Sequence, residues 1–425
     1  FFKTRGEDWN LSLVHARRQR IVTTASYDTI ADDRGHVETD RYTLIDLGKD
    51  WKLNATNTLH QRLYFGDYGY DGEFPYDYST GSIPDPRVIN IDRVRGSWWG
   101  IENRLVNTAF DGQRWTLAVE YRANIRQNQM NYDRGYGCYD YAATPCLDDR
   151  QHSHQITLMA QDEIQLGNAT HLTVGLRYDN LGRLGSFWSP RLGITHDAGR
   201  AGLFKVLYGT AFRSPTVYER AYITPSWSYG NPNVDPEKLR SLELAWEKRL
   251  GPMARLTATV YHLHVDRMIT VDDAGLAING STSKGNGLEV EYEQRWHNGA
   301  RLRGGFSIQY AGDEKQRFDN SPRQMAKLNL VLPTGLPHLT AALEGQWISS
   351  RLANQGANRV GAYALANVNL RYAPVGQSWE ASLGVHNLFD QRHDDPVAMD
   401  EVMGVSRWRM PQIGRSVLLQ GTLRF

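Results

Sequence analysis

The sequence predicts an all-β protein, a transmembrane antiparallel β-barrel, and three observations support that class. Segments in which apolar and polar residues alternate recur along the whole chain of 425 residues. Aromatic residues make up 11% of the chain, with 22 Tyr and 12 Trp, although the mean hydropathy is −0.54. Only alternate residues of a barrel wall touch lipid, which reconciles many aromatic residues with a polar average. The connections between the segments also alternate between short and long.

The alternation is clearest in three segments. From Trp115 to Ala123, from Leu172 to Tyr178 and from Leu242 to Glu247, every second residue is apolar or aromatic. Side chains alternate between the two faces of a strand, so each segment has one apolar and one polar face. No comparable stretch has helical periodicity, and no run approaches the roughly 18 apolar residues that a membrane helix requires.

We expect about nineteen strands on this basis. In chain order they cover Phe1–Thr4, Trp9–Gln19, Tyr42–Leu53, Thr58–Tyr68, Arg93–Asn107, Arg114–Gln127, Ser153–Leu166, His171–Tyr178, Trp188–Thr195, Gly202–Phe212, Leu239–Leu250, Ala254–Val265, Asn286–Trp296, Arg301–Ala311, Gln324–Leu332, Leu339–Ser349, Ala362–Tyr372, Trp379–Asn387 and Gly414–Phe425.

The connections predict the orientation of the strands. The long connections are Arg20–Arg41, Gly69–Asp92, Asn128–His152, Arg213–Lys238, Asp266–Gly285, Arg351–Gly361 and Asp390–Ile413. Short turns such as Phe110–Gln113 and Gly167–Thr170 lie between them. Bacterial outer-membrane barrels have long loops outside the cell and short turns in the periplasm. We therefore expect a bacterial outer-membrane location, with the C-terminus in the periplasm and outer-membrane lipid around the wall.

The two ends of the chain differ. Gly414–Phe425 reads as a strand with one apolar face that closes a barrel, whereas Phe1 follows no initiator Met and no signal peptide. Single-chain bacterial barrels usually have an even number of strands, and lipid does not tolerate an open edge. An odd count near nineteen therefore predicts an N-terminally truncated barrel that lacks its first strands.

The two cysteines, Cys138 and Cys146, lie close together in a stretch rich in Tyr, Gly and Asp. Their spacing permits a small loop closed by a disulfide, which would indicate an oxidising compartment. Two unrelated free thiols are the alternative.

Several short motifs follow one another in a characteristic order. They are Phe212-Arg213-Ser214-Pro215, Asn231-Pro232-Asn233-Val234-Asp235-Pro236-Glu237, Gly285-x-Gly287-x-Glu289, Asn387-Leu388-Phe389-Asp390 and Gly414-Arg415-Ser416. Over essentially the whole chain this order resembles the C-terminal β-barrel of the TonB-dependent outer-membrane receptors. The resemblance implies a 22-stranded barrel in the complete protein and an N-terminal plug that residues 1–425 do not include. Contact with TonB would then be made through the missing plug segment. It also implies that Phe425 is the kind of terminal residue that the outer-membrane assembly machinery recognises.

By the same resemblance, a ligand binds at the outer mouth. The candidate ligand-binding residues are Tyr68, Tyr70, Tyr76, Arg213, Tyr218, Tyr222, Trp227, Tyr229, His393 and Trp408. Amphipathic aromatic rings beside Arg suit a large, partly apolar, anionic ligand such as an extracellular metal chelate. The alternative is an aromatic girdle, in which Tyr and Trp anchor the wall at the membrane interface. The motif glycines, prolines and Asn387 are expected to be architectural.

The resemblance implies active uptake of a scarce nutrient, with a ferric siderophore first among the cargoes. Haem receptors of the family carry a His between the two boxes that Phe212–Pro215 and Asn231–Val234 match, and no His lies between Thr216 and Gly230 here, which lowers the haem interpretation. Cobalamin stays open, as do a passive porin-like channel and a soluble β-rich carbohydrate-binding or propeller protein.

Other function classes have little support in the sequence. Catalytic motifs are absent apart from Ser281-x-x-Lys284 in a probable loop, so we expect no enzyme and no resident cofactor. The pairs His152/His154 and His262/His264 each share a strand face without a third ligand fixed by spacing, so we expect no metal site. A net charge of +1 with no dense basic block argues against a nucleic-acid partner.

Overall fold

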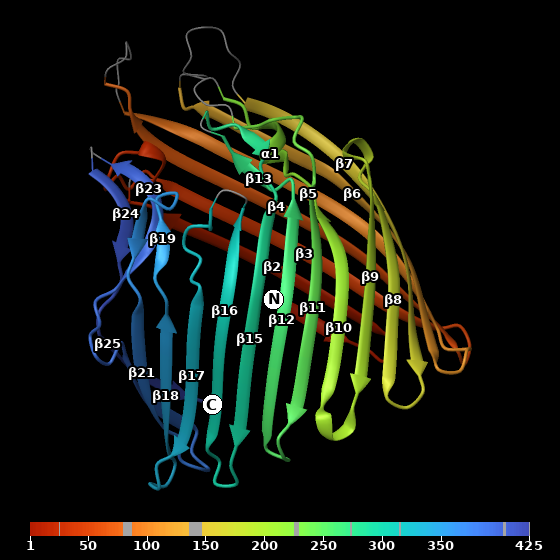
Figure 1. Ribbon diagram of the computed structural model, residues 1–425. Coiled ribbons are helices and arrows are strands. Elements are labelled where there is room, and N and C mark those ends of the chain that lie inside the picture. The colour runs from red at the N-terminus through yellow and green to blue at the C-terminus, as the bar shows by residue number, and fades with distance from the viewer. Residues whose placement is uncertain are drawn as a thin grey trace. The chain divides into compact units, whose positions relative to one another are not determined.

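The structure, a computed structural model, describes residues 1–24, 26–79, 87–135, 147–224, 229–272, 274–313, 316–402 and 405–424. Nineteen strands of this part of the chain belong to one large sheet, in which neighbouring strands such as β1–β2 and β4–β5 are antiparallel (Figure 1). The all-β class and the expected number of strands are therefore confirmed. No helix in the described segments has the length and apolarity needed to cross a membrane.

The strands of the large sheet are β1 (Phe2–Arg5), β2 (Trp9–Ile21), β3 (Val37–Lys52), β4 (Asn57–Asp77), β5 (Arg87–Asn107), β6 (Gln113–Asp133), β7 (Leu147–Leu166), β8 (Thr170–Asn180), β9 (Ser186–Asp197), β10 (Leu203–Arg213), β11 (Glu237–Arg249), β12 (Ala254–Asp266), β15 (Ser283–Arg295), β16 (Arg301–Asp313), β17 (Gln324–Pro333), β18 (Leu339–Ile348), β21 (Tyr363–Tyr372), β22 (Trp379–His386) and β25 (Ser416–Leu423).

Three of the long connections hold small hairpins of their own. The hairpins are β13 (Ile269–Val271) with β14 (Ala277–Asn279), β19 (Arg351–Ala353) with β20 (Asn358–Val360), and β23 (Asp394–Val402) with β24 (Val405–Pro411). The helices are short: α1 (Val217–Ala221) and the 3₁₀ turns η1 (Ser26–Asp28), η2 (Gly182–Leu184) and η3 (Gly199–Ala201).

The chain forms two compact units. The first contains Phe1–Leu192, Gly209–Leu239 and Asp266–Gly280. The second contains Gly193–Tyr208, Arg240–Val265 and Ser281–Phe425.

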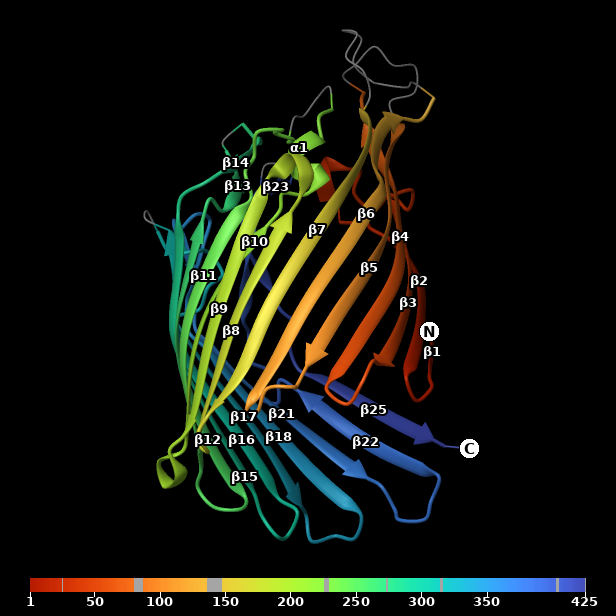
Figure 2. The ribbon, with the colours of Figure 1, turned by 90° about the vertical axis from the view of Figure 1, so that its right-hand side faces the viewer.

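The strands of the first unit are longer than the sequence predicts. The expected loops Gly69–Asp92 and Asn128–His152 are wrong over much of their length, because β4 and β5 pair continuously from Asn57↔Asn107 to Asp77↔Arg87. The Gly, Asp and Tyr residues of this stretch break the apolar alternation that reveals a strand. Main-chain hydrogen bonds nevertheless continue the hairpin beyond the point where the apolar face ends. Figure 2 shows β4 and β5 as long neighbouring strands.

The apolar face of β4 to β7 ends at one level. Among the described residues of these strands, exposed large apolar side chains extend no farther toward the long loops than Phe65, Trp99, Ile125 and Ile156. Phe65 pairs with Trp99, so the limits on β4 and β5 coincide. We call the strand ends beyond this level the extension; it comprises Gly66–Asp77, Arg87–Trp98, Arg126–Asp133 and Leu147–Gln155.

In the second unit the expected two-faced strands are confirmed. Leu242 and Leu244, predicted to share the apolar face of β11, are 49% and 50% exposed. The neighbouring strands have polar opposite faces, with Glu289, Glu291 and Arg303 at alternate positions. Exposed apolar side chains on one face and charges on the other are the pattern of a wall between lipid and water.

Two motif positions have clear structural roles. A Cβ at Gly287 would lie 2.4 Å from Cζ and Oη of Tyr261 on the paired strand β12, so a side chain, not another backbone, occupies the space above this glycine. Asn387 has a φ of +49° and is 5% exposed; its side chain accepts from the N–H of Gln391 and donates to the Gln391 carbonyl. Asp390 accepts the N–H of Arg415 at 2.8 Å, which joins two of the motifs before β25.

Four predicted residues lie outside the described part of the chain. They are Cys138, Cys146, Trp227 and Phe425. The disulfide, the role of Trp227 and the recognition of Phe425 therefore stay predictions.

Candidate functional site

The connection after β10 is organised by helix α1, which starts with a capping box. The Thr216 hydroxyl accepts the N–H of Glu219 at 3.1 Å, and the Glu219 carboxylate accepts the N–H of Thr216 at 2.7 Å. Pro215 precedes this cap and cannot donate a backbone hydrogen bond. The sequence Pro-Thr-x-x-Glu therefore starts a helix through local hydrogen bonds, with few tertiary contacts required.

Arg213 connects the three parts of this connection. Its guanidinium forms two hydrogen bonds to Glu219, both of 3.0 Å, and two to Glu237, of 2.8 and 2.7 Å. The hydrogen bonds from Arg213 hold the pKa of Glu237 below its usual value. Burial acts to raise the pKa of Glu219, but the hydrogen bonds from Arg213 and Thr216 outweigh it and lower that pKa. The end of β10, the start of α1 and the start of β11 are therefore joined by one cation.

Hairpin β13–β14 covers the second half of the connection. The N–H of Ala277 donates to the carbonyl of Tyr229 at 2.8 Å, and the amide of Asn231 donates to the carbonyl of Ala277 at 2.9 Å. The Asp235 N–H donates to Asn279 at 2.8 Å. The Asn-Pro-Asn box is thus fixed against a neighbouring loop by its first asparagine.

Helix α1 rests on the extension of β5 to β7. The Tyr222 hydroxyl donates to Asp92 of β5 at 3.1 Å and accepts from the amide of Asn131 of β6 at 3.1 Å. Gln129 donates to the carbonyl of Val217, and Arg220 donates to Gln151 of β7 at 2.8 Å. Both ends of the short helix are therefore attached to the sheet (Figure 1).

Asp92 is the most perturbed carboxylate at this contact. Burial raises its pKa to about 6, and the hydrogen bonds from Tyr222 and from the Arg93 N–H counteract this only in part. Its Oδ1 atom is buried without a hydrogen-bond partner among the described residues. Asp92 lies beyond the level of Trp99, outside the lipid-facing band, so water and solutes can reach this end of the sheet.

Four of the predicted tyrosines gather around Asp92. Burial raises the pKa values of Tyr76 and Tyr218 to about 12, and it also raises those of Tyr70 and Tyr222; the Asp92 charge contributes to all four shifts. The ring of Tyr218 lies 4.6 Å from those of Tyr222 and Tyr229. We call these five tyrosines and Asp92 the tyrosine cluster.

The remaining predicted residues are placed elsewhere. Tyr68 donates to Asp40 at 2.9 Å, nearer the lipid-facing band. In the second unit His393 lies with its ring 4.5 Å from that of Tyr363, and Trp408 lies under the Arg409 guanidinium at 5.1 Å. Arg213 and Tyr222 have their polar groups engaged within the protein. Whether any of these residues contacts a ligand stays a prediction.

Two residues at the centre of the contact were missed by sequence reasoning. Asp92 and Asn131 sit in stretches expected to be loops, where a single Asp or Asn is an ordinary turn residue. Only their position on paired strands beneath α1 gives them a role, and the sequence carries no signal for that position. The tyrosines could be found because so many aromatic residues in polar stretches are unusual.

The arrangement suits binding by aromatic contact and hydrogen bonding. The described residues include no group of three or more His, Cys, Asp or Glu side chains placed to hold a metal ion. Tyrosine rings offer apolar contact area with a polar tip, and one buried carboxylate provides a hydrogen-bond acceptor.

Comparison with known proteins gives consistent results. Residues 3–388 match the family described as TonB dependent receptor-like, beta-barrel. The ferric enterobactin receptor PirA of Pseudomonas aeruginosa is 26% identical over 198 residues, which are 42% of this chain and 27% of PirA. The aligned region thus spans about a quarter of that relative.

Two solved structures share the fold at low identity. A mutant of the ferric enterobactin receptor PfeA of Pseudomonas aeruginosa superposes with a TM-score of 0.74 at 15% identity, covering 99% of this chain and 68% of PfeA. The copper transporter OprC gives a TM-score of 0.75 at 14% identity, covering 99% of this chain and 70% of OprC. Their different cargoes show that the fold alone does not identify a ligand.

Proposed function

Because the chain belongs to the TonB-dependent receptor β-barrel family, we propose that it is the barrel of an outer-membrane receptor that takes up a ferric siderophore by TonB-coupled transport. The family places the chain in the bacterial outer membrane. Family members are transport receptors and not enzymes. The family match over residues 3–388 is the observation that carries the proposal.

The cargo class is supported by the relative and by the tyrosine cluster. The curated relative is named as a ferric enterobactin receptor. Aromatic rings gathered at the loop end of the sheet suit the flat, partly apolar surface of a large iron chelate. Tyr70, Tyr76, Tyr218 and Tyr229 are proposed to contact the cargo, whereas Arg213 and Tyr222 hold the connection that presents Tyr218 and Tyr229.

Haem is a weaker candidate, since the sequence lacks a His between Thr216 and Gly230 and the described residues show no group of metal ligands there. Cobalamin stays an alternative cargo. A passive channel is the alternative mechanism. It predicts entry that depends on solute size and not on TonB.

Uptake by living cells tests the cargo and the mechanism together. A strain that lacks its own receptors is complemented with the complete gene and given iron-55 as a tris-catecholate, a trihydroxamate or a citrate chelate, with labelled cobalamin and haem as further arms. Saturable uptake of one chelate that stops when TonB is deleted supports the proposal. Unchanged uptake across all arms, or uptake that continues without TonB, contradicts it.

The orientation is tested separately. We propose that the long connections lie outside the cell, so Ser79→Cys beyond β4 is expected to react with a membrane-impermeant maleimide on intact cells. Asn298→Cys, in the short turn between β15 and β16, is expected to react only after lysis. The reverse pattern would contradict the orientation.

A further inference from the structure

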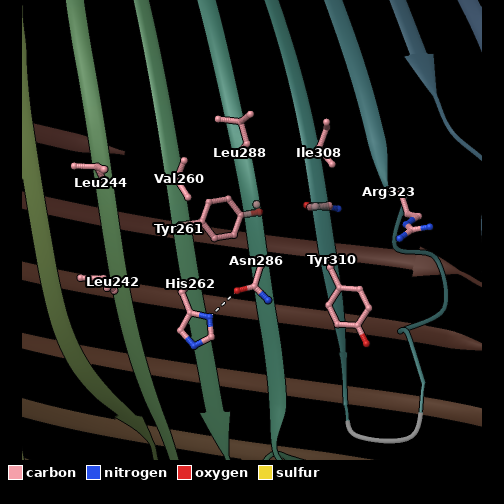
Figure 3. A pocket seen from close by; sticks show the side chains of 12 residues that line it. Leu242, Leu244, Val260, Tyr261, His262, Asn286, Leu288, Ile308, Tyr310 and Arg323 are labelled. Atoms are coloured by element: carbon pink, nitrogen blue, oxygen red, sulfur yellow. Dashed lines mark hydrogen bonds between the residues drawn. The ribbon is translucent and has the colours of Figure 1, made fainter.

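A groove crosses the exposed apolar face of four neighbouring strands in the second unit. It has a volume of about 550 Å³, and its apolar lining is Leu242 and Leu244 of β11, Val260 of β12, Leu288 of β15 and Ile308 of β16. Figure 3 shows Leu244, Val260, Leu288 and Ile308 side by side across these strands. Their side chains are 37–52% exposed. The groove therefore lies on the face that meets lipid.

The groove becomes polar toward the long-loop ends of the strands. His262 hydrogen-bonds Asn286 at 2.6 Å, and Tyr310 lies beside them (Figure 3). Arg323, immediately before β17, lines the same end of the groove. An apolar groove capped by polar groups matches the boundary between lipid tails and head groups.

Arg323 also lines a second hollow, so the two hollows adjoin at this residue. The second hollow has a volume of about 490 Å³ and is lined as well by Ile308, Gln324, Ser349 and Ser350. Arg359 donates to the Ser350 hydroxyl at 3.0 Å, which brings a second guanidinium to this wall. Arg317 donates to the carbonyl of Ser321 at 3.0 Å.

These three arginines form a cationic cluster that has no carboxylate partner within the described part of the chain. Burial lowers the pKa of Arg317, and the charges of Arg323 and Arg359 lower it further. Within the described residues no Asp or Glu forms an ion pair with Arg317, Arg323 or Arg359, and Nε of Arg317 is buried without a partner. The nearby Asp319 accepts the backbone N–H groups of Gln355 and Gly356 instead.

The other end of β16 is different. Arg303, on the opposite face of the strand near that end, pairs with Glu291 at 3.2 Å. Uncompensated cations that repel one another raise the free energy of the empty site, and an anion that pairs with them lowers it. Among the residues that line the groove, the arginine is Arg323, and it lies at the polar end.

We propose that this groove binds a phosphate-bearing lipid, with acyl chains along Val260, Leu288 and Ile308 and a phosphate at Arg323, assisted by Arg317 and Arg359. The inference depends on the proposed function in one respect: the proposed orientation in the outer membrane decides which leaflet supplies the lipid. A free anion would use the arginines but not the apolar groove. A protein partner would need a polar rim around the whole patch, whereas only one end of this groove is polar.

Native mass spectrometry of the complete receptor in detergent micelles tests the proposal. The probe is bis-phosphorylated hexa-acyl lipid A, with phosphatidylethanolamine and inorganic phosphate as controls. Arg323→Gln is expected to weaken lipid A binding roughly tenfold, which corresponds to about 1.4 kcal/mol, because a hydrogen bond to a charged phosphate is lost. Arg317→Gln is expected to act in the same direction. Val260→Trp, which fills the groove and keeps the arginines, is expected to remove bound acyl chains.

Arg303→Gln is the matched control. Arg303 is an exposed arginine of strand β16 that pairs with Glu291 and does not line the groove. Equal lipid A binding by Arg323→Gln and Arg303→Gln overturns the proposal. So does full binding by Val260→Trp, displacement of the lipid by inorganic phosphate, or a protein found in the groove instead of lipid. Chelate uptake is measured in parallel: lost lipid binding with normal uptake leaves the proposed function intact, and the converse leaves the lipid site intact.

Discussion

Replacing Tyr222 by Phe tests whether one hydroxyl holds helix α1 on the sheet. The ring stays, but the hydroxyl that donates to Asp92 and accepts from Asn131 is lost. Tyr222 is only 6% exposed, so water does not readily replace it. A hydrogen bond to a charged, buried carboxylate is worth about 1.5–3 kcal/mol.

The effect depends on pH because Asp92 titrates. Its pKa in the folded protein, about 6, is above its value in an unfolded chain, so the folded state binds more protons between roughly pH 4 and 6 and the docked loop loses stability as pH rises through that window. The Tyr222 hydrogen bond lowers that pKa, so its loss raises the pKa further. We therefore expect the variant to cost about 2–3 kcal/mol near pH 7.5, and only about 1 kcal/mol near pH 5, where the carboxyl is largely neutral.

Hydrogen–deuterium exchange of the complete receptor in micelles measures this cost. The reporter is the peptide that contains the N–H of Asn231, which donates to the Glu219 carbonyl at 2.9 Å and closes the loop over α1. Exchange is expected to be about 30- to 150-fold faster near pH 7.5 and about fivefold faster near pH 5, after correction for intrinsic rates. Tyr218→Phe on the same helix, 38% exposed and without a hydroxyl hydrogen bond to a described residue, is the control. Equal protection in both variants, or a larger effect at the lower pH, would refute the reasoning.

Three further substitutions test motif residues. Arg213→Ala is expected to destabilise the connection by about 1–2 kcal/mol and to raise the pKa values of Glu219 and Glu237. Hydrogen exchange at Ile269, whose N–H donates to Glu237, is then expected to become faster. Unchanged exchange contradicts the role of Arg213 in joining the connection. Asn387→Ala is expected to lower the Tm by more than Asn387→Gly, because both lose the side-chain hydrogen bonds but only Ala is strained at a φ of +49°; the opposite order contradicts this. Gly287→Val is expected to cost about 1–3 kcal/mol by displacing the Tyr261 ring, whereas Gly305→Val, with 3.9 Å of clearance, costs less; equal Tm values for the two variants contradict it.

The sheet could be predicted from the sequence because its signal is local. Leu242 and Leu244 alternate with polar residues, and that alternation survives in any wall between lipid and water. The extension could not be predicted, because the described residues of its strands form no exposed apolar face beyond Phe65 and Trp99 and its Gly, Asp and Tyr residues interrupt the alternation. Its stability comes from pairing with neighbouring strands, and the residue types around Asp92 do not predict that pairing.

The candidate site could be predicted only in part, for a related reason. Tyr70, Tyr76 and Tyr218 were found by their residue type, but the type does not say which ring stays accessible to a ligand and which is buried against other protein groups. Tyr222 has the same chemistry but is buried, with its hydroxyl bonded to Asp92 and Asn131. The sequence does not reveal this, because both partners lie on strands far away along the chain. Distinguishing contact residues from supports requires the long-range pairing that only the structure supplies.

The position of Arg213 changes what the loop motifs mean. An arginine beside aromatic rings suggests a contact for an anionic cargo, yet both carboxylates that it meets come from the neighbouring motifs, Glu219 and Glu237. One cation between two anions leaves this group with a net negative charge, and the nearby Asp92 adds to it above its pKa of about 6. The tyrosine cluster is therefore electronegative at neutral pH. A cargo held there gains more from ring contact, hydrogen-bond donors or a positive group of its own than from its negative charge. Among chelates of equal size, the least anionic should therefore be preferred and the most anionic should bind weakest.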